Sequence, residues 1–100
     1  MRAPGRMAID RAQRFIKREP RVDLRRPAVL VNSNGDESDV IILDISASGF
    51  RLEVSESPKI GEFVTLRVER GVDFEAQIRW ALGTEAGGAF VAPVDQYELK

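Results

Sequence analysis

Apolar and polar residues alternate in short runs from residue 28 onward, which is the period of a strand with one face in a core and one in water. Turn-forming residues, mainly glycine, proline, asparagine and serine, interrupt these runs about every 8 to 12 residues. The pattern predicts six strands, at residues 28–31, 39–45, 50–55, 64–69, 74–80 and 89–92. We therefore expect an all-β fold over residues 28–92, either a small six-stranded antiparallel barrel or a sandwich.

The same alternation predicts which side chains fill the barrel. Trp80 shares strand spacing with Ile78, so it is interpreted as a core residue rather than as a platform for a stacked base. The glycine-containing stretch at residues 83–88 is predicted to be a turn before the last strand. The residues expected to be mostly buried are Val29, Val31, Ile42, Leu52, Leu66, Ile78, Trp80 and Phe90.

The N-terminal arm, residues 1–26, follows a different pattern. Apolar residues recur near helical spacing over residues 7–18, which predicts a short amphipathic helix that ends before Pro20. Residues 21–26 are predicted to be a basic hinge, and residues 1–20 are expected to be among the least ordered of the chain without a ligand. The predicted organisation is an arm at residues 1–26, a barrel at residues 27–93 and a tail at residues 94–100.

The charge of the chain is divided unevenly between arm and body. Residues 1–26 carry nine basic and three acidic side chains, a net charge of +6, whereas the rest carries six basic and thirteen acidic side chains, a net charge of −7. This asymmetry indicates either an anionic partner for the arm or contact between arm and body. The basic arm also raises the alternative of nonspecific nucleic-acid binding, which the acidic body disfavours.

The composition excludes several kinds of chemistry. The chain has no cysteine and no histidine, which removes thiolate nucleophiles, zinc–thiolate sites and the commonest general base. Its carboxylates are scattered without a neighbouring base or nucleophile, so neither an enzyme nor a bound metal or other cofactor is predicted. No run approaches the roughly 20 apolar residues of a membrane span, and a secretory signal is lacking. We expect a soluble cytoplasmic protein.

Two short motifs carry the candidate chemistry. Asp44, Ser46 and Gly49 form an Asp-x-Ser-x-x-Gly sequence that, taken alone, is best interpreted as a turn, with Gly49 as a residue that tolerates positive φ where the chain reverses or bulges. Upstream, Arg21 and Arg25 form an Arg-x-x-x-Arg sequence. Arginine forks stack on bases and grip phosphates, while a carboxylate accepts hydrogen bonds from guanine, so the two motifs together suit an anionic guanine nucleotide.

These motifs, together with the ending "IRWALGTEAGGAFV", resemble those of PilZ domains, and the resemblance covers roughly residues 18–93. It implies a six-stranded barrel that binds the bacterial messenger cyclic di-GMP. In that family the arginine motif grips guanines and phosphates, and the Asp-x-Ser-x-x-Gly loop contacts guanine and phosphate. The ligand-binding residues that the resemblance and the basic arm together indicate are Lys17, Arg18, Arg21, Arg25, Asp44, Ser46 and Gly49.

The register of the arginine motif has two alternatives. The literal match uses Arg21 and Arg25, whereas a register that places the second arginine directly before the first strand uses Lys17 and Arg21. The resulting functional hypothesis is a sensor whose arm folds over cyclic di-GMP and signals to a protein partner of unknown identity. The alternative is a degenerate PilZ-like interaction domain that docks a partner without binding the nucleotide.

Overall fold

The computed structural model describes residues 20–68, 72–95 and 97. The predicted helix at residues 7–18 lies outside these residues, as does the expectation about order in residues 1–20 apart from Pro20. Within the described part of the chain, no helix is long and apolar enough to cross a membrane.

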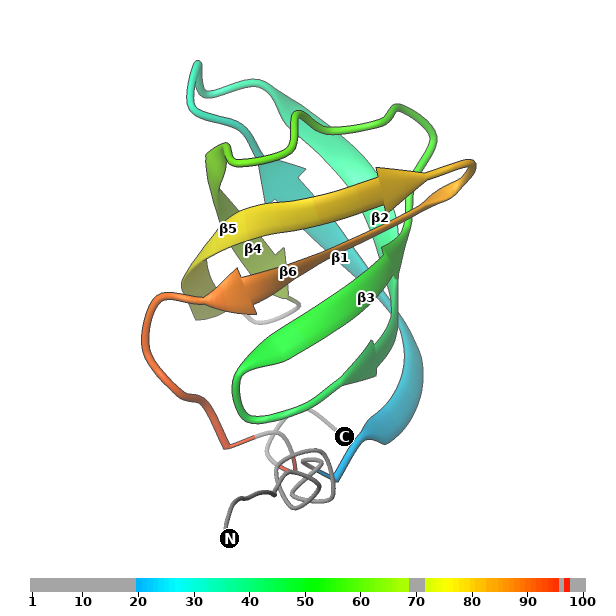
Figure 1. Ribbon diagram of the computed structural model, residues 1–100, viewed down its shortest axis with the longest axis vertical. Coiled ribbons are helices and arrows are strands. Elements are labelled where there is room, and N and C mark those ends of the chain that lie inside the picture. Colours follow the sequence, from blue (N-terminus) through cyan, green and yellow to red (C-terminus); the bar gives the residue numbers. More distant parts are fainter. Residues whose placement is uncertain (1–19, 69–71, 96, 98–100) are drawn as a thin grey trace, which may run out of the picture.

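Six antiparallel strands close into a barrel (Figure 1). Around the barrel they follow the order β1, β2, β3, β6, β5 and β4, and β4 pairs back with β1. The predicted six-stranded antiparallel barrel is therefore confirmed. The strands are β1 (Val22–Val31), β2 (Glu37–Ile45), β3 (Gly49–Glu53), β4 (Phe63–Val68), β5 (Val72–Leu82) and β6 (Glu85–Phe90).

The barrel interior is one apolar cluster to which every strand contributes. Phe50 packs at a tilt against Phe90, with ring centroids 5.2 Å apart, and Phe74 also packs at a tilt against Phe90, with ring centroids 5.7 Å apart. Burying a side chain of this size contributes about 1.5–3 kcal/mol relative to exposure, so the cluster accounts for much of the stability. The largest side chains with almost no exposure are Phe50, Ile42, Ile45, Leu52, Leu66 and Ile78.

The sequence predicted the wrong phase for β1. Ala28 and Leu30 are buried in the core, whereas Val29 and Val31 are only partly buried. All four residues are apolar, so alternation is absent here and the pattern cannot say which set faces inward.

Trp80 was also predicted wrongly, because it is 39% exposed rather than buried. A β-bulge between Ile78 and Trp80 shifts the pairing of β5 with β6, so Ile78 remains inside while Trp80 moves to the outer face. There the indole lies over Gly87, where a Cβ atom would collide with its ring nitrogen. Gly87 on the outer face of β6 therefore leaves room for the Trp80 ring, which any larger residue at this position would displace.

The predicted turn at residues 83–88 is wrong as well, because only Gly83 and Thr84 form the turn and β6 already begins at Glu85. Gly87 and Gly88 lie inside that strand, and a Cβ on either would meet a neighbouring strand or side chain. These two glycines therefore permit close packing rather than chain reversal.

The segment at residues 21–26, predicted to be a hinge, belongs to β1 from Val22 onward. Val22 is buried and pairs with Ile45, which extends the strand beyond the predicted domain boundary at residue 27. The register between β1 and β2 shifts between Asp23 and Arg26, and Arg25 in this bulge has a φ of 49°. Arg25 is the one non-glycine residue with positive φ in the described part of the chain.

Candidate functional site

The carboxylate of Asp44 is held by two arginines from different strands. Arg21 Nη1 donates to Asp44 Oδ1 at 2.8 Å, and Arg51 Nε donates to Asp44 Oδ2 at 2.8 Å. Asp44 is buried, with only 8% of its side chain exposed, whereas both arginine side chains are about half exposed. Burying a carboxylate costs free energy unless hydrogen-bonding partners compensate, and the two arginines supply these partners.

The position of Asp44 on the outer face follows from the local register of β2. The pairing of β2 with β3 shifts between Ile42 and Asp44, so Ile42 faces the core and Asp44 pairs with Arg51 across the outer surface. Leu43, the extra residue of the bulge, is buried yet stands outside the inner core cluster. Beneath the charged groups the outer surface therefore has an apolar floor.

Arg51 also links Asp44 to β6. Its Nη1 donates to Glu85 Oε1 at 3.0 Å. The hydrogen bond to Asp44 first, and then that to Glu85, raises the pKa of the Arg51 guanidinium above its ordinary value. The network runs from Arg21 through Asp44 and Arg51 to Glu85 and connects β2, β3 and β6 with the start of β1.

The loop of residues 46–49 is closed by its own hydrogen bonds. The backbone N–H of Ser46 donates to the Gly49 carbonyl at 2.8 Å, and the N–H of Gly49 donates to Ser46 Oγ at 3.2 Å. The carbonyl of Ala47 accepts the N–H of Val94, and that of Ser48 accepts the N–H of Phe90. Because Ser46 is buried and its hydroxyl serves the loop, its role in the structure is to shape the loop beside Asp44.

Gly49 is required for a reason that differs from the predicted one. It is not among the glycines with positive φ. Instead, a Cβ at Gly49 would lie 2.6 Å from the backbone carbonyl oxygen of Gly88. The glycine therefore lets β3 approach β6 closely at the end of the loop.

Arg25 lies on the same outer surface but has a different partner. Its Nη1 is 3.5 Å from Glu53 Oε1, and 72% of its side chain is exposed. Together with Arg51 it lines a hollow of about 540 Å³ whose other walls are Asp23, Leu43 and Glu85. The hollow adjoins the Asp44 network and offers two cations, two carboxylates and the apolar Leu43.

The structure thus brings four of the seven sequence-predicted site residues into one place: Arg21, Asp44, Ser46 and Gly49. Arg25 lies nearby across the hollow, without contact to Asp44 in the described ion pairs. Lys17 and Arg18 lie outside the described residues.

Sequence reasoning missed Arg51, Glu85 and Trp80 as neighbours of the site. The position of Arg51 could have been inferred only from strand pairing, because an antiparallel hairpin around the loop places Arg51 across from Asp44. The pairing continues from Arg51 to Gly87 and from Gly87 to Trp80. One row of the outer surface therefore contains a carboxylate, an arginine, a glycine and a half-exposed indole.

Chemically, this surface can bind an anion that also presents hydrogen-bond donors. Arg21, Arg25 and Arg51 can grip phosphate oxygens, and Asp44 can accept N–H groups. Within the described residues, no group of three or more acidic side chains is arranged to hold a metal ion.

The barrel has the fold of a solved structure described as the crystal structure of the PilZ domain of CeSA from a cellulose-synthesizing bacterium. The match has a TM-score of 0.65 at 17% sequence identity and covers 80% of this chain and 86% of the other. A sequence comparison with curated proteins produced no match. The two chains therefore share a small closed barrel architecture.

The family model for the PilZ domain matches residues 15–99. The chain therefore belongs to the PilZ domain family, whose members are cyclic di-GMP-binding modules. The expected resemblance is confirmed by this match and by the shared fold.

Proposed function

We propose that this PilZ domain is a sensor of cyclic di-GMP that binds the nucleotide on the outer barrel surface between Arg21, Arg25 and the loop at residues 44–49. The observation that carries the proposal is the 2.8 Å contact between Arg21 and Asp44, which joins the two motifs of the family although they are 23 residues apart. If the two motifs had occurred only by chance, the fold would not be expected to bring them into contact.

Binding would exchange protein partners for ligand partners. Each of the arginines Arg21, Arg25 and Arg51 is paired with a carboxylate of the protein itself. A phosphate accepts the same paired N–H groups, and guanine N–H groups can satisfy Asp44 in return. When Arg21 turns to the ligand, Asp44 keeps its bond to Arg51. When Arg25 turns to the ligand, Glu53, whose side chain is about half exposed, is left in contact with water. No buried charge therefore loses all of its partners.

A nucleobase also needs a space with an apolar wall, and the hollow beside the network offers one. Nucleotide and drug-sized sites are commonly about 300–1,000 Å³ and combine apolar walls with a few polar groups. The hollow of about 540 Å³ has Leu43 as an apolar wall and Arg25 and Arg51 as cations whose flat forks can stack on a base. The positive φ of Arg25 supports this role, because backbone strain concentrates at functional sites.

The output of the sensor would be a change in the arm that precedes Arg21. Because Arg21 directly precedes β1, a ligand that captures its side chain would change the direction in which the preceding chain leaves the barrel. We propose that a cytoplasmic protein partner recognises this change, and that the domain acts by binding rather than by catalysis.

Calorimetric titration of the full chain with cyclic di-GMP tests the proposal, with GTP and an RNA oligonucleotide as controls. We expect saturable binding of cyclic di-GMP and weak or no response to GTP and RNA. Absence of a response at millimolar cyclic di-GMP would overturn the proposal and leave a degenerate interaction domain. Equal responses to all three would indicate nonspecific attraction of anions to the basic arm.

A further inference from the structure

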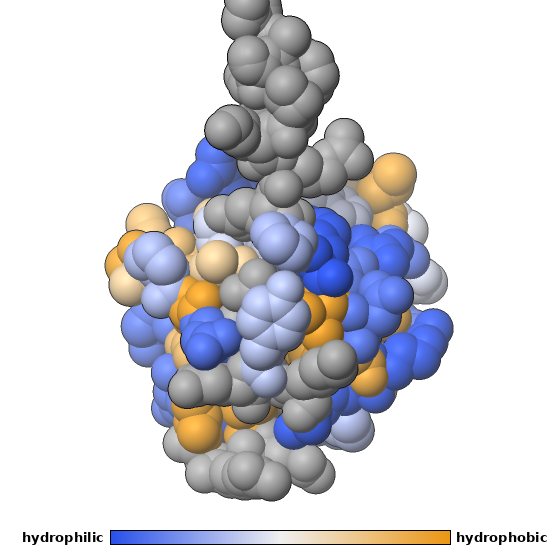
Figure 2. Space-filling model, turned by 90° about the horizontal axis from the view of Figure 1, so that it is seen from below, coloured by the Kyte–Doolittle hydropathy of each residue, from blue (hydrophilic) through white to orange (hydrophobic). Residues whose placement is uncertain are grey.

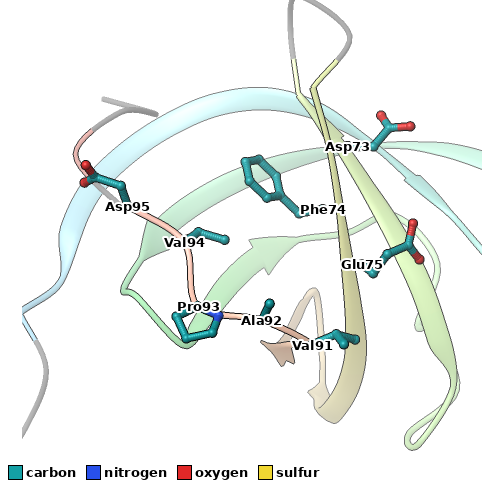
Figure 3. Close-up of a pocket in the computed structure, with 8 residues that line it drawn as sticks. All are labelled: Asp73, Phe74, Glu75, Val91, Ala92, Pro93, Val94 and Asp95. Atoms are coloured by element: carbon teal, nitrogen blue, oxygen red, sulfur yellow. The ribbon is translucent and has the colours of Figure 1, made fainter.

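A second groove, on a different part of the barrel, lies between the start of β5 and the segment that follows β6 (Figure 3). The N–H of Val91 still donates to the Glu75 carbonyl at 2.9 Å, after which the chain leaves β5. The N–H of Val94 then donates to the Ala47 carbonyl at 2.9 Å, which fixes the far end of the segment. The groove has a volume of about 480 Å³ and is lined by Asp73, Phe74, Glu75, Val91, Ala92, Pro93, Val94 and Asp95.

The groove combines an apolar floor with an acidic rim. Phe74 and Val94 point into the space between β5 and the segment, and Asp73 and Asp95 stand at its two ends (Figure 3). Val91 is 64% exposed, although it is apolar and lies in a groove. Seen from the end of the barrel where β1 starts, apolar patches alternate with hydrophilic side chains (Figure 2).

Among the residues that the structure describes, the acidic rim has no cation of its own. None of the described residues that line the groove is basic. Asp73 accepts a hydrogen bond from Arg67 of β4, but Glu75 and Asp95 have no ion-pair partner among the residues the structure describes. An occupant that fits this groove would be apolar on one face and basic on its edges.

The chain itself contains such a segment. Residues 7–18 carry four basic side chains and one acidic side chain, a net charge of +3. Their apolar residues recur at helical spacing, and that spacing places Ala12, Phe15 and Ile16 on one face. Both the charge and the apolar face therefore complement the groove.

The root of the arm and the groove flank the same loop. Arg21 contacts Asp44, and Val22 pairs with Ile45, directly before the loop whose Ala47 anchors Val94. Figure 1 shows the start of β1 and the segment after β6 at the same end of the barrel. A helix of twelve residues is about 18 Å long, which is enough to cross one end of a barrel whose facing walls lie about 10 Å apart.

We propose that residues 7–18 dock in cis into the groove between β5 and the segment after β6. Phe15 and Ile16 cover Phe74 and Val91, and the basic side chains face the acidic rim. Because arm and groove belong to one chain, a weak contact suffices, since a short tether gives a millimolar effective concentration. The docking does not depend on the proposed nucleotide function, and its test uses no nucleotide.

The absence of native cysteine makes a disulfide test clean. In full-length Ala12→Cys/Val91→Cys, the equilibrium with a glutathione redox buffer measures the effective concentration of the two thiols. The matched control is Ala12→Cys/Leu82→Cys, because Leu82 is also exposed, at 79%, and lies about 26 Å farther along β5 than Phe74. We expect an effective concentration at least tenfold higher for the Val91 pair than for the Leu82 pair.

Two further variants test whether the higher effective concentration of the Val91 pair depends on the proposed contacts. Adding Phe15→Glu to the Val91 pair, or the double change Glu75→Lys/Asp95→Lys, should bring its effective concentration down to that of the control. Equal values for the two cysteine pairs would overturn the proposal. Disulfides formed mainly between chains would also overturn docking in cis and indicate that a second copy of the chain occupies the groove.

A measurement without cysteine keeps the proposal testable if a cysteine variant fails to fold. Amide chemical shifts of Val91 and Val94 are compared between the unaltered chain and Phe15→Glu at low protein concentration. We expect shift changes that are confined to the groove and abolished by high salt. Unchanged groove shifts would overturn the proposal.

Discussion

Arg51 holds one oxygen of the Asp44 carboxylate while Arg21 holds the other, each at 2.8 Å. The two arginines differ in what else they contact, because Arg51 is also bound to Glu85 whereas Arg21 contacts Asp44 alone among the described ion pairs. If Arg21 turns toward a ligand, Arg51 still orients the carboxylate. The network thus separates a displaceable arginine from one that is fixed to the barrel.

Replacing the displaceable arginine should therefore affect binding more than folding. We expect Arg21→Ala to lower the free energy of unfolding by about 1 kcal/mol or less, since its side chain is half exposed and Arg51 still pairs with the buried Asp44. Binding of cyclic di-GMP should weaken by about 1–3 kcal/mol, and Asp44→Asn should have a similar effect. Calorimetry and urea unfolding measure the two quantities.

Arg67→Ala is the matched control for this experiment. The Arg67 side chain is 41% exposed against 51% for Arg21, and it also pairs with carboxylates, Asp73 and Glu37, but it lies on β4 away from the loop. Nucleotide affinity should be unchanged in this variant. A loss as large as that of Arg21→Ala would show that overall charge, rather than the Asp44 network, governs binding.

The register of the arginine motif is decided by a second set of variants. The strained backbone of Arg25 and its place in the hollow favour the literal register, Arg21 with Arg25. We expect Arg25→Ala to cost about 1–3 kcal/mol of cyclic di-GMP binding and Lys17→Arg to leave the affinity unchanged. The other register would be indicated by the reverse result, because an arginine at position 17 would add a stacking fork.

The close approach of β3 to β6 makes Gly49 sensitive to any side chain. The added Cβ of Gly49→Ala would meet the backbone of Gly88, which has no rotamer to yield, so we expect a loss of about 1–3 kcal/mol in unfolding free energy. Gly83→Asn is the control, because Gly83 has a φ of 62° that asparagine adopts readily and no atom near its Cβ position. Equal stability of Gly49→Ala and the unaltered protein would contradict the packing argument.

The number of strands could be predicted because polar residues alternate with Phe50, Leu52, Leu66 and Ile78 at a period of two. Their closure into a barrel rather than a sandwich was implied by the resemblance to the family. The face of the sheet on which each residue lies after a β-bulge could not be predicted. Each bulge shifts the alternation by one residue, and nothing in the sequence at Ile78–Trp80 marks where the extra residue stands. That single shift moves Trp80 from the predicted core to the outer surface.

The candidate site was predictable to a different degree for each residue. The contact between Arg21 and Asp44 agrees with the resemblance to the family, and the pairing of Arg51 with Asp44 could have been inferred from a hairpin around the loop. Gly87 and Gly88 of β6 were wrongly predicted to lie in a turn. In the sequence alone, a glycine that makes room for a neighbouring side chain such as Trp80 looks the same as a glycine in a turn.

Gly87 offers a direct test of the placement of Trp80. In Gly87→Ala the new Cβ would fall on the indole, which must then move because it is a side chain on the outer surface. We expect a red-shifted fluorescence emission with the far-ultraviolet circular dichroism of an intact barrel. Trp80 is the single tryptophan, so the signal has one source. An unchanged emission spectrum would contradict the observed contact.

The loop contact between Ser33 and Glu62 predicts a pH dependence of stability. Glu62 Oε2 accepts the Ser33 hydroxyl at 2.7 Å and the Ser33 N–H at 3.1 Å. The hydroxyl contact first, and then the backbone contact, lowers the pKa of Glu62 below its ordinary value. A carboxylate with a lowered folded-state pKa stabilises the fold above its unfolded-state pKa of about 4.3, and this contribution is lost as the pH falls through the folded-state value.

We therefore expect Ser33→Ala to lower the free energy of unfolding at pH 7, by less than about 1 kcal/mol because the contact is exposed and solvent screens it. The difference from the unaltered protein should shrink between about pH 5 and pH 3, where Glu62 becomes protonated in both. Urea unfolding at several pH values measures it, and Glu56→Gln serves as the control, since Glu56 is exposed and has no hydrogen-bond partner among the described residues. A Ser33→Ala difference that stays constant down to pH 3 would mean that the contact stabilises the loop without favouring the charged form of Glu62.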